Sequence, residues 1–400
     1  MAAPRPLEGL RVLDIGTLIA GPFGASLLAD FGADVIKVEQ PGTGDSMRVS
    51  GGKQVDGVSL GWVTLARNKR SITLNLREPE GQALFLRLVA VADLVIENFT
   101  PGTLERWQIG PEVLRRANPR LILVRVSGFG QTGPYSRRGG YDRIALGYSG
   151  LMYATGYPDR PPVRPAFAMA DFTTAMFGAL SALMALYHRD VHQGPGQEID
   201  LALFEPIFRI SEDLIPAYDR LGVVRERIGN RNPGFSPAGN FLTRDGRWLQ
   251  IAAGGDRVWR RMAVAMDQPE LADDERFLTA QGRSRNADQL ETLIAAWIAE
   301  QDFEAAFAIL DAAGVPAGGI YTAAEIAADP HFAAREDIIS VDHPAIGPVK
   351  MPGVVPKFSA TPGRVDWPGP MLGEHNPAVY GELLGLDEQG LGALRDRGVV

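Results

Sequence analysis

The chain has 400 residues, of which 45% are apolar and 22% charged, which is enough for one large domain or two to three ordinary ones. The formal net charge of −8 gives no general attraction to nucleic acid or to an anionic membrane. The chain has no cysteine, which excludes disulfides, thiolate catalysis and cysteine-bound metals, and which agrees with a cytoplasmic location. Met1–Pro6 has no apolar segment, so we expect no signal peptide.

The N-terminal part of the chain alternates short apolar strands with helices. We expect strands at Leu10–Ile15, Asp34–Glu39, Arg70–Leu76, Leu94–Glu97 and Leu121–Val126. The helices expected between them are Gly24–Gly32, Pro79–Val91 and Gly110–Ala117. Short β-branched strands separated by helices indicate parallel βαβ units. The pattern predicts a doubly wound α/β domain with a Rossmann-like parallel sheet.

A glycine-rich segment, Gly128–Gly150, follows this domain core, and loops of this length are usually functional or mobile. After it comes a long apolar stretch, Pro165–His188, for which the helical pattern predicts a helix over Asp171–Arg189. Its length is near that of a membrane span. The carboxylate of Asp171 and several hydroxyls favour a buried core helix instead. Glu198–Leu203 is expected to be a further strand.

The composition of the chain changes near residue 229. A turn cluster at Gly229–Gly234 precedes a hairpin formed by Asn240–Leu242 and Trp248–Ala252, and helices then continue to about Ala328. The helical Pro377–Leu384 and Glu388–Arg397 end the chain. We therefore expect a large domain over 1–228, a small α+β domain over 229–330, and a C-terminal part, 331–400, that returns to the large domain.

Several common site motifs are missing. Gly16–Gly24 follows the first strand, but it has no G-x-G-x-x-G pattern, and Pro22 has no N–H to offer a phosphate. Neither a Walker A loop nor a G-x-S-x-G elbow is present. The five histidines have no H-E-x-x-H spacing. The pattern therefore gives no support to an NAD site, a metal site or a serine–histidine triad.

Asp171 is the only acid between Asp159 and Asp190, and it lies at the start of the long apolar helix. One interpretation is an N-cap, in which the carboxylate accepts N–H bonds from the first helical turn. The other is a nucleophile, kept ionised by the helix N-terminus and dry by its apolar neighbours, that attacks an acyl carbon. The residues alone leave both open.

Basic residues follow the expected strand ends, where open α/β sheets bind ligands. Arg67-Asn68-Lys69-Arg70 precedes one strand and Arg77 ends it, while Arg106 follows the Glu97–Gly102 segment. Arginine is well suited to phosphate oxygens, so these side chains are either binding residues or ordinary solvated charges.

Together these segments resemble the class III CoA-transferase family, which includes formyl-CoA transferase, carnitine CoA-transferases and α-methylacyl-CoA racemases. The resemblance runs over nearly the whole chain and is carried by landmarks that occur in order. They are Leu18–Pro22, Gly32–Glu39, Asn68–Ser71, Glu97–Gly102, Gly128–Pro134, Gly140-Tyr141-Asp142, Ala170-Asp171 and Leu372–His375.

The resemblance implies that Asp171 is the catalytic nucleophile, which forms a mixed anhydride and then an aspartyl-CoA thioester. It implies no permanently bound cofactor and no metal, with coenzyme A entering as acyl-CoA substrate. The family's CoA-binding pattern carries onto Ile19, Ala20, Gln40, Leu74, Asn75, Leu76, Arg77, Asn98, Phe99, Thr100, Arg106, Arg138, Tyr141 and Asp142. The chain departs from this pattern at two positions. Some members carry an arginine where this chain has Gln40. Formyl-CoA transferase has a lysine where this chain has Gly139, and Arg137 or Arg138 could supply that positive charge here.

The resemblance also implies an interlocked homodimer, in which each chain has a Rossmann-like domain built from both ends and a small domain between them. Some transferases cover the aspartate with a tetraglycine loop. Here the comparable residues are Asn230–Phe235, which have no such run, so a swinging glycine lid is not expected.

Tyr141 separates the two branches of chemistry. The racemases use a histidine in the corresponding Gly-His-Asp element, and a tyrosine is a poor base at neutral pH. We therefore expect CoA transfer, with α-methylacyl-CoA racemase or epimerase, an intramolecular CoA transferase and a catalytically dead binding protein as alternatives. The closest similarity is to members acting on dicarboxylates, whose second carboxylate needs a cation. The candidates are Arg48, Arg138, Arg143 and Arg164.

Overall fold

The computed structural model describes residues 4–50, 52–232 and 234–400, and the chain divides into two compact units. The first unit contains the chain up to Leu151, Arg164–Leu214 and His331–Val400. The second contains Met152–Val163 and Ile215–Pro330. The expected small domain, 229–330, falls inside the second unit, which also takes in 152–163 and 215–228.

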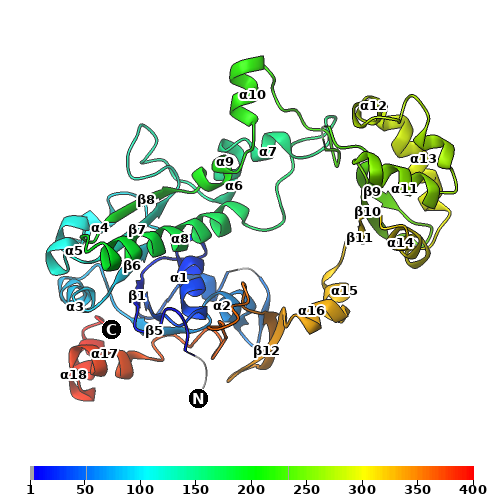
Figure 1. The fold of residues 1–400 in the computed structure, drawn as a ribbon. Coiled ribbons are helices and arrows are strands. Elements are labelled where there is room, and N and C mark those ends of the chain that lie inside the picture. The colour runs from blue at the N-terminus through cyan, green and yellow to red at the C-terminus, as the bar shows by residue number, and fades with distance from the viewer. Residues whose placement is uncertain (1–3, 51, 233) are drawn as a thin grey trace. The chain divides into compact units, whose positions relative to one another are not determined.

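A parallel sheet of six strands forms the centre of the first unit (Figure 1). Its spatial order is β5-β2-β1-β6-β7-β8, and every neighbouring pair is parallel. The strands are β1 (Arg11–Asp14), β2 (Asp34–Glu39), β5 (Lys69–Thr73), β6 (Leu94–Glu97), β7 (Ile122–Ser127) and β8 (Glu198–Ala202). This is the doubly wound order, in which ligands bind outside the carboxyl ends of the strands where the order reverses, here β1 and β6. The predicted α/β class is confirmed.

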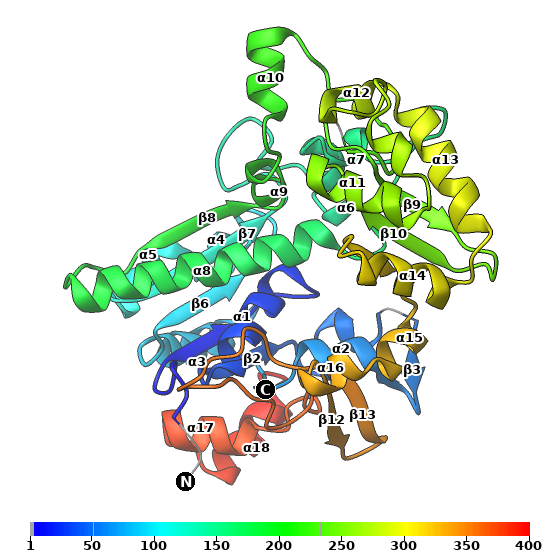
Figure 2. The same cartoon turned by 45° about the vertical axis from the view of Figure 1, so that its right-hand side comes forward.

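Helices cover both faces of this sheet. On one face α1 (Ala20–Asp30) packs against α8 (Met169–Val191), which lies along β7 and β8 (Figure 2). The other face shares one hydrophobic core with four helices, which are α3 (Pro79–Val89), α5 (Pro111–Ala117), α17 (Asn376–Leu384) and α18 (Glu388–Asp396). Burial of Phe85 and Tyr380 in this core holds the C-terminal helices on the first unit.

Helix α1 begins earlier than the expected Gly24. It starts at Ala20 and therefore includes Pro22 in its first turn. A proline is tolerated there because the first N–H groups of a helix have no intrahelical partner. The early start makes Ala20–Gly24 part of the helix and leaves Gly16–Ile19 as a short loop after β1.

Helix α8 is long and apolar enough to cross a membrane by length and composition alone, but half of its most apolar window is buried inside the fold. The buried side contains small residues such as Ala175, Gly178 and Ala182. Ala175 lies against α1, since a Cβ at Gly24 would be 2.9 Å from the Ala175 carbonyl oxygen, whereas Gly178 faces β7 and β8. The outer side exposes Met176, Leu180, Met184 and Tyr187. Helix α8 was expected to be a buried core helix. Within a single chain, only one side of it is covered.

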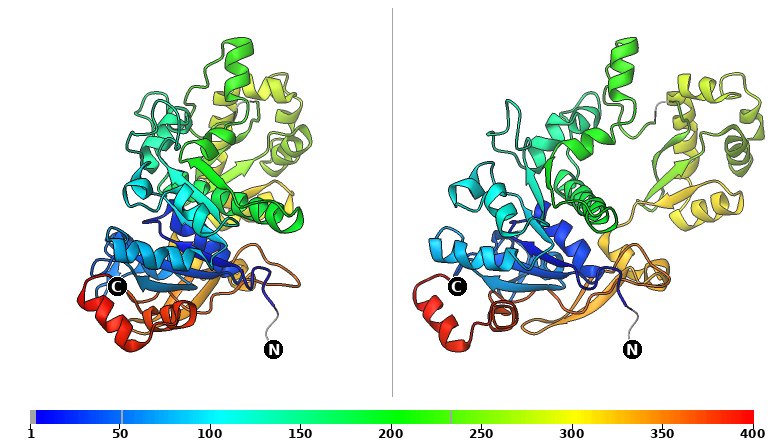
Figure 3. Two further views of the ribbon diagram at one scale, coloured as in Figure 1. Left: turned by 90° about the vertical axis from the view of Figure 1, so that its left-hand side faces the viewer. Right: turned by 60° about the vertical axis from the view of Figure 1, so that its left-hand side comes forward.

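The second unit has its own sheet and core (Figure 3). Strands β9 (Ala238–Leu242) and β10 (Trp248–Ala252) form the expected antiparallel hairpin, and β11 (Ala317–Gly319) pairs with β10. The helices that surround this sheet are α11 (Asp256–Ala265), α12 (Ala280–Arg285), α13 (Ala287–Ala299) and α14 (Phe303–Ala312). Trp259 and Phe277 fill the core at ring centroids 6.2 Å apart.

Short elements complete the chain. They are β3 (Gln54–Val55), β4 (Val58–Ser59), α2 (Leu60–Leu65), α4 (Thr103–Arg106), α6 (Asp142–Tyr148), α7 (Leu151–Ala154), α9 (Glu205–Arg209), α10 (Leu214–Leu221), α15 (Ala323–Ala328), α16 (Pro330–Ala334), β12 (Ile338–His343) and β13 (Gly347–Pro352), with 3₁₀ turns at Ser46–Arg48 and Pro269–Ala272.

Candidate active site

Asp171 lies in the first turn of α8 but does not cap it. The helix begins at Met169, its N-cap residue is Ala168, and no side chain of that residue makes a cap hydrogen bond. The N-cap interpretation of Asp171 is therefore wrong. Met169 and Ala170 are good helix formers, so the helix continues two residues further back than the acid.

The cap of α8 comes from another helix. The backbone N–H of Ala170 donates to Oδ1 of Asp142 at 2.8 Å, and Asp142 is the buried first residue of α6. This bond satisfies one of the N–H groups that a helix leaves unpaired at its start. Asp142, expected to contact CoA, therefore has a structural partner that the sequence did not predict.

The carboxyl group of Asp171 is half-buried, and it has no hydrogen-bond or ion-pair partner within the described residues. Burial, and secondly the charge of Asp142, raise the pKa of Asp171 to about 7. The expectation that the helix start keeps this group fully ionised is therefore not met, because lost hydration and a like charge disfavour the carboxylate. A perturbed acid without a structural partner is typical of a functional site.

Close packing of glycines fixes the helix that carries Asp142. A Cβ at Gly140 would lie 2.4 Å from the Cα of Gly128, and one at Gly128 would lie 2.6 Å from the Cα of Gly140. Only glycines permit this approach, which brings the start of α6 to the end of β7. On the other side of Asp171, the rings of Phe172 and Phe23 meet edge-to-face with centroids 4.9 Å apart.

A cavity of about 250 Å³ opens at the carboxyl ends of the central strands, where the sheet topology predicts ligand binding. Five of the predicted CoA-binding residues line it, namely Gln40, Leu74, Leu76, Arg77 and Phe99. Arg77 is the one cation of this lining for which the described structure shows no acidic partner, since Lys37 is paired with Asp14 and Asp45. We call this the strand-end cavity.

Other predicted residues support the walls of this cavity. Asn98 holds the loop after β1, because its Oδ1 accepts the Thr17 N–H at 2.7 Å and its Nδ2 donates to the Thr17 carbonyl at 2.8 Å. Asn75 accepts the Arg77 N–H at 3.2 Å. The remaining members are Ile19, which packs on the Met47–Trp62 cluster, Ala20 at the start of α1, exposed Thr100, and Arg106, which donates to Thr103 at 2.8 Å.

The sequence missed the residues that shape this loop. Oδ1 of Asp45 accepts the N–H of Leu18, which has a left-handed φ of 62°, and Oδ2 of Asp45 lies 2.9 Å from Nζ of the buried Lys37. Thr43–Ser46 and Trp107 also line the cavity. The signal available in the sequence was the Gly42-Thr43-Gly44-Asp45 run, which begins three residues after the end of β2, at the edge where open α/β sheets bind ligands.

The predicted CoA-binding residues thus form two groups: those at the strand-end cavity, and those near Asp171 at the start of α6. Arg138 and Tyr141 do not line the strand-end cavity: Arg138 stacks 3.7 Å above the ring of Tyr135, and Tyr141 is 72% exposed beside Asp142. The β1–α1 loop joins the groups, since it runs from Thr17 at the cavity to α1, whose Phe23 packs on the neighbour of Asp171.

The four arginines considered for a second carboxylate differ in availability. Arg48 is unsuitable, because it forms a bidentate pair with Glu39 at 2.8 and 2.7 Å and stacks 3.8 Å above Trp62. Arg164 donates to the carbonyls of Pro165 and Ala166. Arg138 and Arg143 have no acidic partner in the described part of the chain. Arg138 stacks on Tyr135, whereas Arg143 is exposed on α6 directly after Asp142.

Comparison with known proteins identifies the family. The model of CoA-transferase family III matches residues 7–376. The chain is 50% identical to succinyl-CoA–D-citramalate CoA-transferase of Chloroflexus aurantiacus, over 99% of this chain and 98% of that one. It is 33% identical to human succinyl-CoA:glutarate CoA-transferase, over 99% and 90% respectively.

A solved structure agrees. A CAIB/BAIF family protein from Brucella suis is 37% identical and superimposes with a TM-score of 0.86, covering 95% of this chain and 100% of that one. The resemblance expected from the ordered landmarks is confirmed at the level of family and fold. Because the family model and full-length relatives cover nearly the whole chain, it belongs to the family III CoA-transferases and is a CoA-transferase.

Proposed function

We propose that this enzyme transfers CoA from an acyl-CoA donor such as succinyl-CoA to a short dicarboxylic acid, with Asp171 as covalent nucleophile. The observation that carries the assignment of Asp171 is its half-buried carboxyl group, free of protein partners in the described structure, beside the capping Asp142. A carboxyl group that makes no structural bond remains available to a substrate.

The first half of the reaction loads CoA onto the enzyme. The ionised carboxylate of Asp171 attacks the thioester carbonyl of the donor, the C–S bond breaks, and CoA leaves as thiolate. This gives a mixed anhydride between Asp171 and the donor acid. The thiolate then attacks the aspartyl carbonyl carbon, which releases the donor carboxylate and leaves an aspartyl-CoA thioester.

The second half repeats these steps with the acceptor. A carboxylate oxygen of the acceptor attacks the aspartyl thioester, thiolate leaves, and a second mixed anhydride forms. Thiolate attack on the acceptor's acyl carbon then yields the new acyl-CoA and restores the Asp171 carboxylate. No oxidant or reductant is consumed, and no proton needs to be removed from carbon.

The choice of a dicarboxylic acceptor rests on the relatives and on Arg143, an exposed cation without an acidic partner in the described structure. Relatives are named as succinyl-CoA transferases for D-citramalate, L-malate and glutarate. Arg143, on the same helix as Asp142, is the cation that we propose for the far carboxylate, because guanidinium pairs with carboxylate in a bidentate manner.

CoA itself is proposed to bind at the strand-end cavity. Arg77 offers a charge for its phosphates, and Phe99 and Trp107 offer apolar surface. The enzyme is proposed to act in the cytoplasm as an interlocked homodimer. The exposed apolar side of α8 supports the dimer, since exposed apolar patches of this kind usually mark contact surfaces.

Trapping of the covalent intermediate tests the proposal. The protein is incubated with succinyl-CoA, treated with hydroxylamine or borohydride, and analysed by peptide mass spectrometry. We expect modification of Asp171 alone, and no modification and no CoA exchange in Asp171→Ala, which still binds CoA. Deuterium incorporation at the α-carbon of an acyl-CoA without any adduct would overturn the proposal in favour of a racemase.

A further inference from the structure

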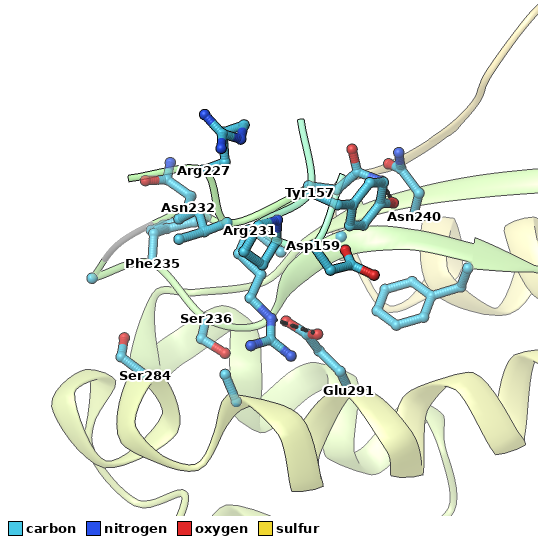
Figure 4. Close-up of a pocket in the computed structure, with 18 residues that line it drawn as sticks. Tyr157, Asp159, Arg227, Arg231, Asn232, Phe235, Ser236, Asn240, Ser284 and Glu291 are labelled. Atoms are coloured by element: carbon cyan, nitrogen blue, oxygen red, sulfur yellow. Dashed lines mark hydrogen bonds and ion pairs between the residues drawn. The ribbon is translucent and has the colours of Figure 1, made fainter. Parts of the chain in front are cut away.

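Ion pairs between arginine and glutamate take different places at two cavities of this protein. In the second unit, a cavity of about 600 Å³ has Arg231 and Glu291 in its lining, and their side chains point at one another and pair at 3.1 Å (Figure 4). Those charges lie on the cavity surface and neutralise each other there. At the strand-end cavity, by contrast, the buried Arg125 and its glutamate partners do not belong to the lining.

Arg125 joins three carboxylates that come from different elements. It lies on β7 and is only 4% exposed, and its Nε donates to Oε1 of Glu97 at 2.8 Å. Its Nη1 lies 3.0 Å from Oε1 of Glu105 and 3.1 Å from Oε1 of Glu198. Desolvation offsets much of the attraction in a buried ion pair, so the main consequence of this network is the geometry that it imposes on β6, α4 and β8.

One arm of the network reaches Phe99. Oε2 of Glu97 accepts the backbone N–H of Phe99 at 2.6 Å, while Oε1 of the same carboxylate is held by Arg125. Glu97 is buried, so water does not compete for either bond. The carboxylate therefore sets the direction in which the chain leaves β6, and with it the place of Phe99 in the cavity lining.

A second arm reaches Trp107 through α4. Glu105 lies within this short helix, and Trp107 directly follows it, with its N–H donating to the Thr103 carbonyl at 3.1 Å. The rings of Phe99 and Trp107 meet edge-to-face with centroids 5.0 Å apart, and both residues line the strand-end cavity. Arg125 therefore ties down both members of one aromatic pair.

The third arm leads away from the cavity. Glu198 is the first residue of β8 and stands opposite Leu123, two residues before Arg125 on β7. The cavity opens at the carboxyl ends of the strands, so Glu198 lies toward the other end of the sheet. It shares Nη1 of Arg125 with Glu105 but has no connection to the aromatic pair.

We propose that Arg125 and Glu105 are positioning residues, which hold the Phe99–Trp107 pair in the orientation that receives CoA. This inference rests on the proposed binding of CoA at the strand-end cavity. Rings that are already fixed bind a ligand without the entropic cost of ordering them. Loosening α4 should therefore weaken the binding of acyl-CoA and leave the chemistry at Asp171 unchanged.

The test compares Glu105→Ala with Glu198→Ala, because removal of Arg125 itself would leave Glu97 buried and unpaired. Each variant takes one carboxylate from the same Nη1, and both side chains are partly exposed, at 45% and 30%, so either loss should lower the melting temperature only slightly. We expect Glu105→Ala to raise the KM for succinyl-CoA about fivefold at unchanged kcat. Glu198→Ala, the matched control, should leave both constants unchanged. Loss of a negative charge alone would lower the KM for the anionic CoA, so an increase reports the lost position of the rings.

A second readout needs no CoA. In protein labelled with 5-fluorotryptophan, the fluorine resonance of Trp107, identified by its loss in Trp107→Phe, should shift in Glu105→Ala and stay in place in Glu198→Ala. An unshifted resonance, or an equal KM in the two glutamate variants, overturns the inference. Arg77→Met separates this failure from that of the proposed function. A raised KM in Arg77→Met but not in Glu105→Ala contradicts the positioning role alone, whereas an unchanged KM in both overturns the cavity assignment and this inference with it.

Discussion

Asp142 and Asp171 are held at neighbouring helix starts: the Oδ1 of Asp142 accepts the backbone N–H of Ala170 at 2.8 Å, one residue before Asp171. The same carboxylate that caps α8 therefore places a negative charge beside Asp171, the nucleophile that we propose. Its charge adds to burial in raising the pKa of Asp171 to about 7. The side chain of Asp142 thus both caps α8 and raises the pKa of Asp171.

The first prediction concerns pH. Attack on a thioester requires the ionised form of Asp171, whose pKa is raised to about 7, so the fraction of active carboxylate rises with pH through neutrality. We expect the single-turnover rate of adduct formation with succinyl-CoA to be about tenfold higher at pH 8 than at pH 6, as for any base with a midpoint near 7. A rate that stays constant from pH 5 to pH 8 would show that the group is ionised well below neutrality.

The second prediction separates the charge of Asp142 from its cap. Asp142→Asn keeps an oxygen that accepts the Ala170 N–H but removes the charge, so we expect the midpoint of the pH profile to move down. Burial, the larger cause, should hold it above the ordinary value. Asp142→Ala also loses the cap and should lower the free energy of unfolding by about 1 kcal/mol, read from denaturant titration. An unchanged midpoint in Asp142→Asn would remove Asp142 from the control of Asp171.

Local sequence patterns sufficed for the frame of the fold. The strands Asp34–Glu39 and Leu94–Glu97 were predicted with their observed bounds, because each is an apolar β-branched run ended by an acid where the buried strand meets the sheet edge. The ligand end of the sheet followed from the order of strands and helices. Five residues carried over from the family pattern do line a cavity there.

Contacts between distant residues could not be predicted in this way. The bond from Ala170 to Asp142 spans 28 residues, and nothing in the periodicity near either residue indicates it. The pairing of Gly229 with the Gly156 carbonyl, at 2.9 Å, similarly draws 152–163 into the second unit. The sequence places Asp171 near the start of a helix, which suggests a cap. It does not show the backbone angles that make Ala168 the N-cap residue of α8.

The third prediction tests the glycine contact that positions α6. In Gly140→Ala the new Cβ would lie 2.4 Å from the backbone of Gly128, so the start of α6 must move and the Asp142 cap must lengthen. We expect a loss of stability of about 1 to 3 kcal/mol together with slower adduct formation. Gly139→Ala is the matched control, because a Cβ there meets nothing within 4 Å. Equal stability of the two variants would show that this glycine pair does not fix the helix.

The last prediction concerns the cation of the strand-end cavity. Arg77 is exposed, lines the cavity and has no acidic partner in the described structure, so its replacement removes a charge without leaving another charge unpaired. We expect Arg77→Met to raise the KM for succinyl-CoA about tenfold with little change in kcat, since a phosphate contact far from the thioester stabilises ground state and transition state equally. The effect should shrink at high salt, because exposed charge pairs are screened. Arg116→Met, an exposed arginine on α5, is the control that leaves KM unchanged. A fall in kcat at constant KM would instead place Arg77 in the chemistry of Asp171 rather than in CoA binding.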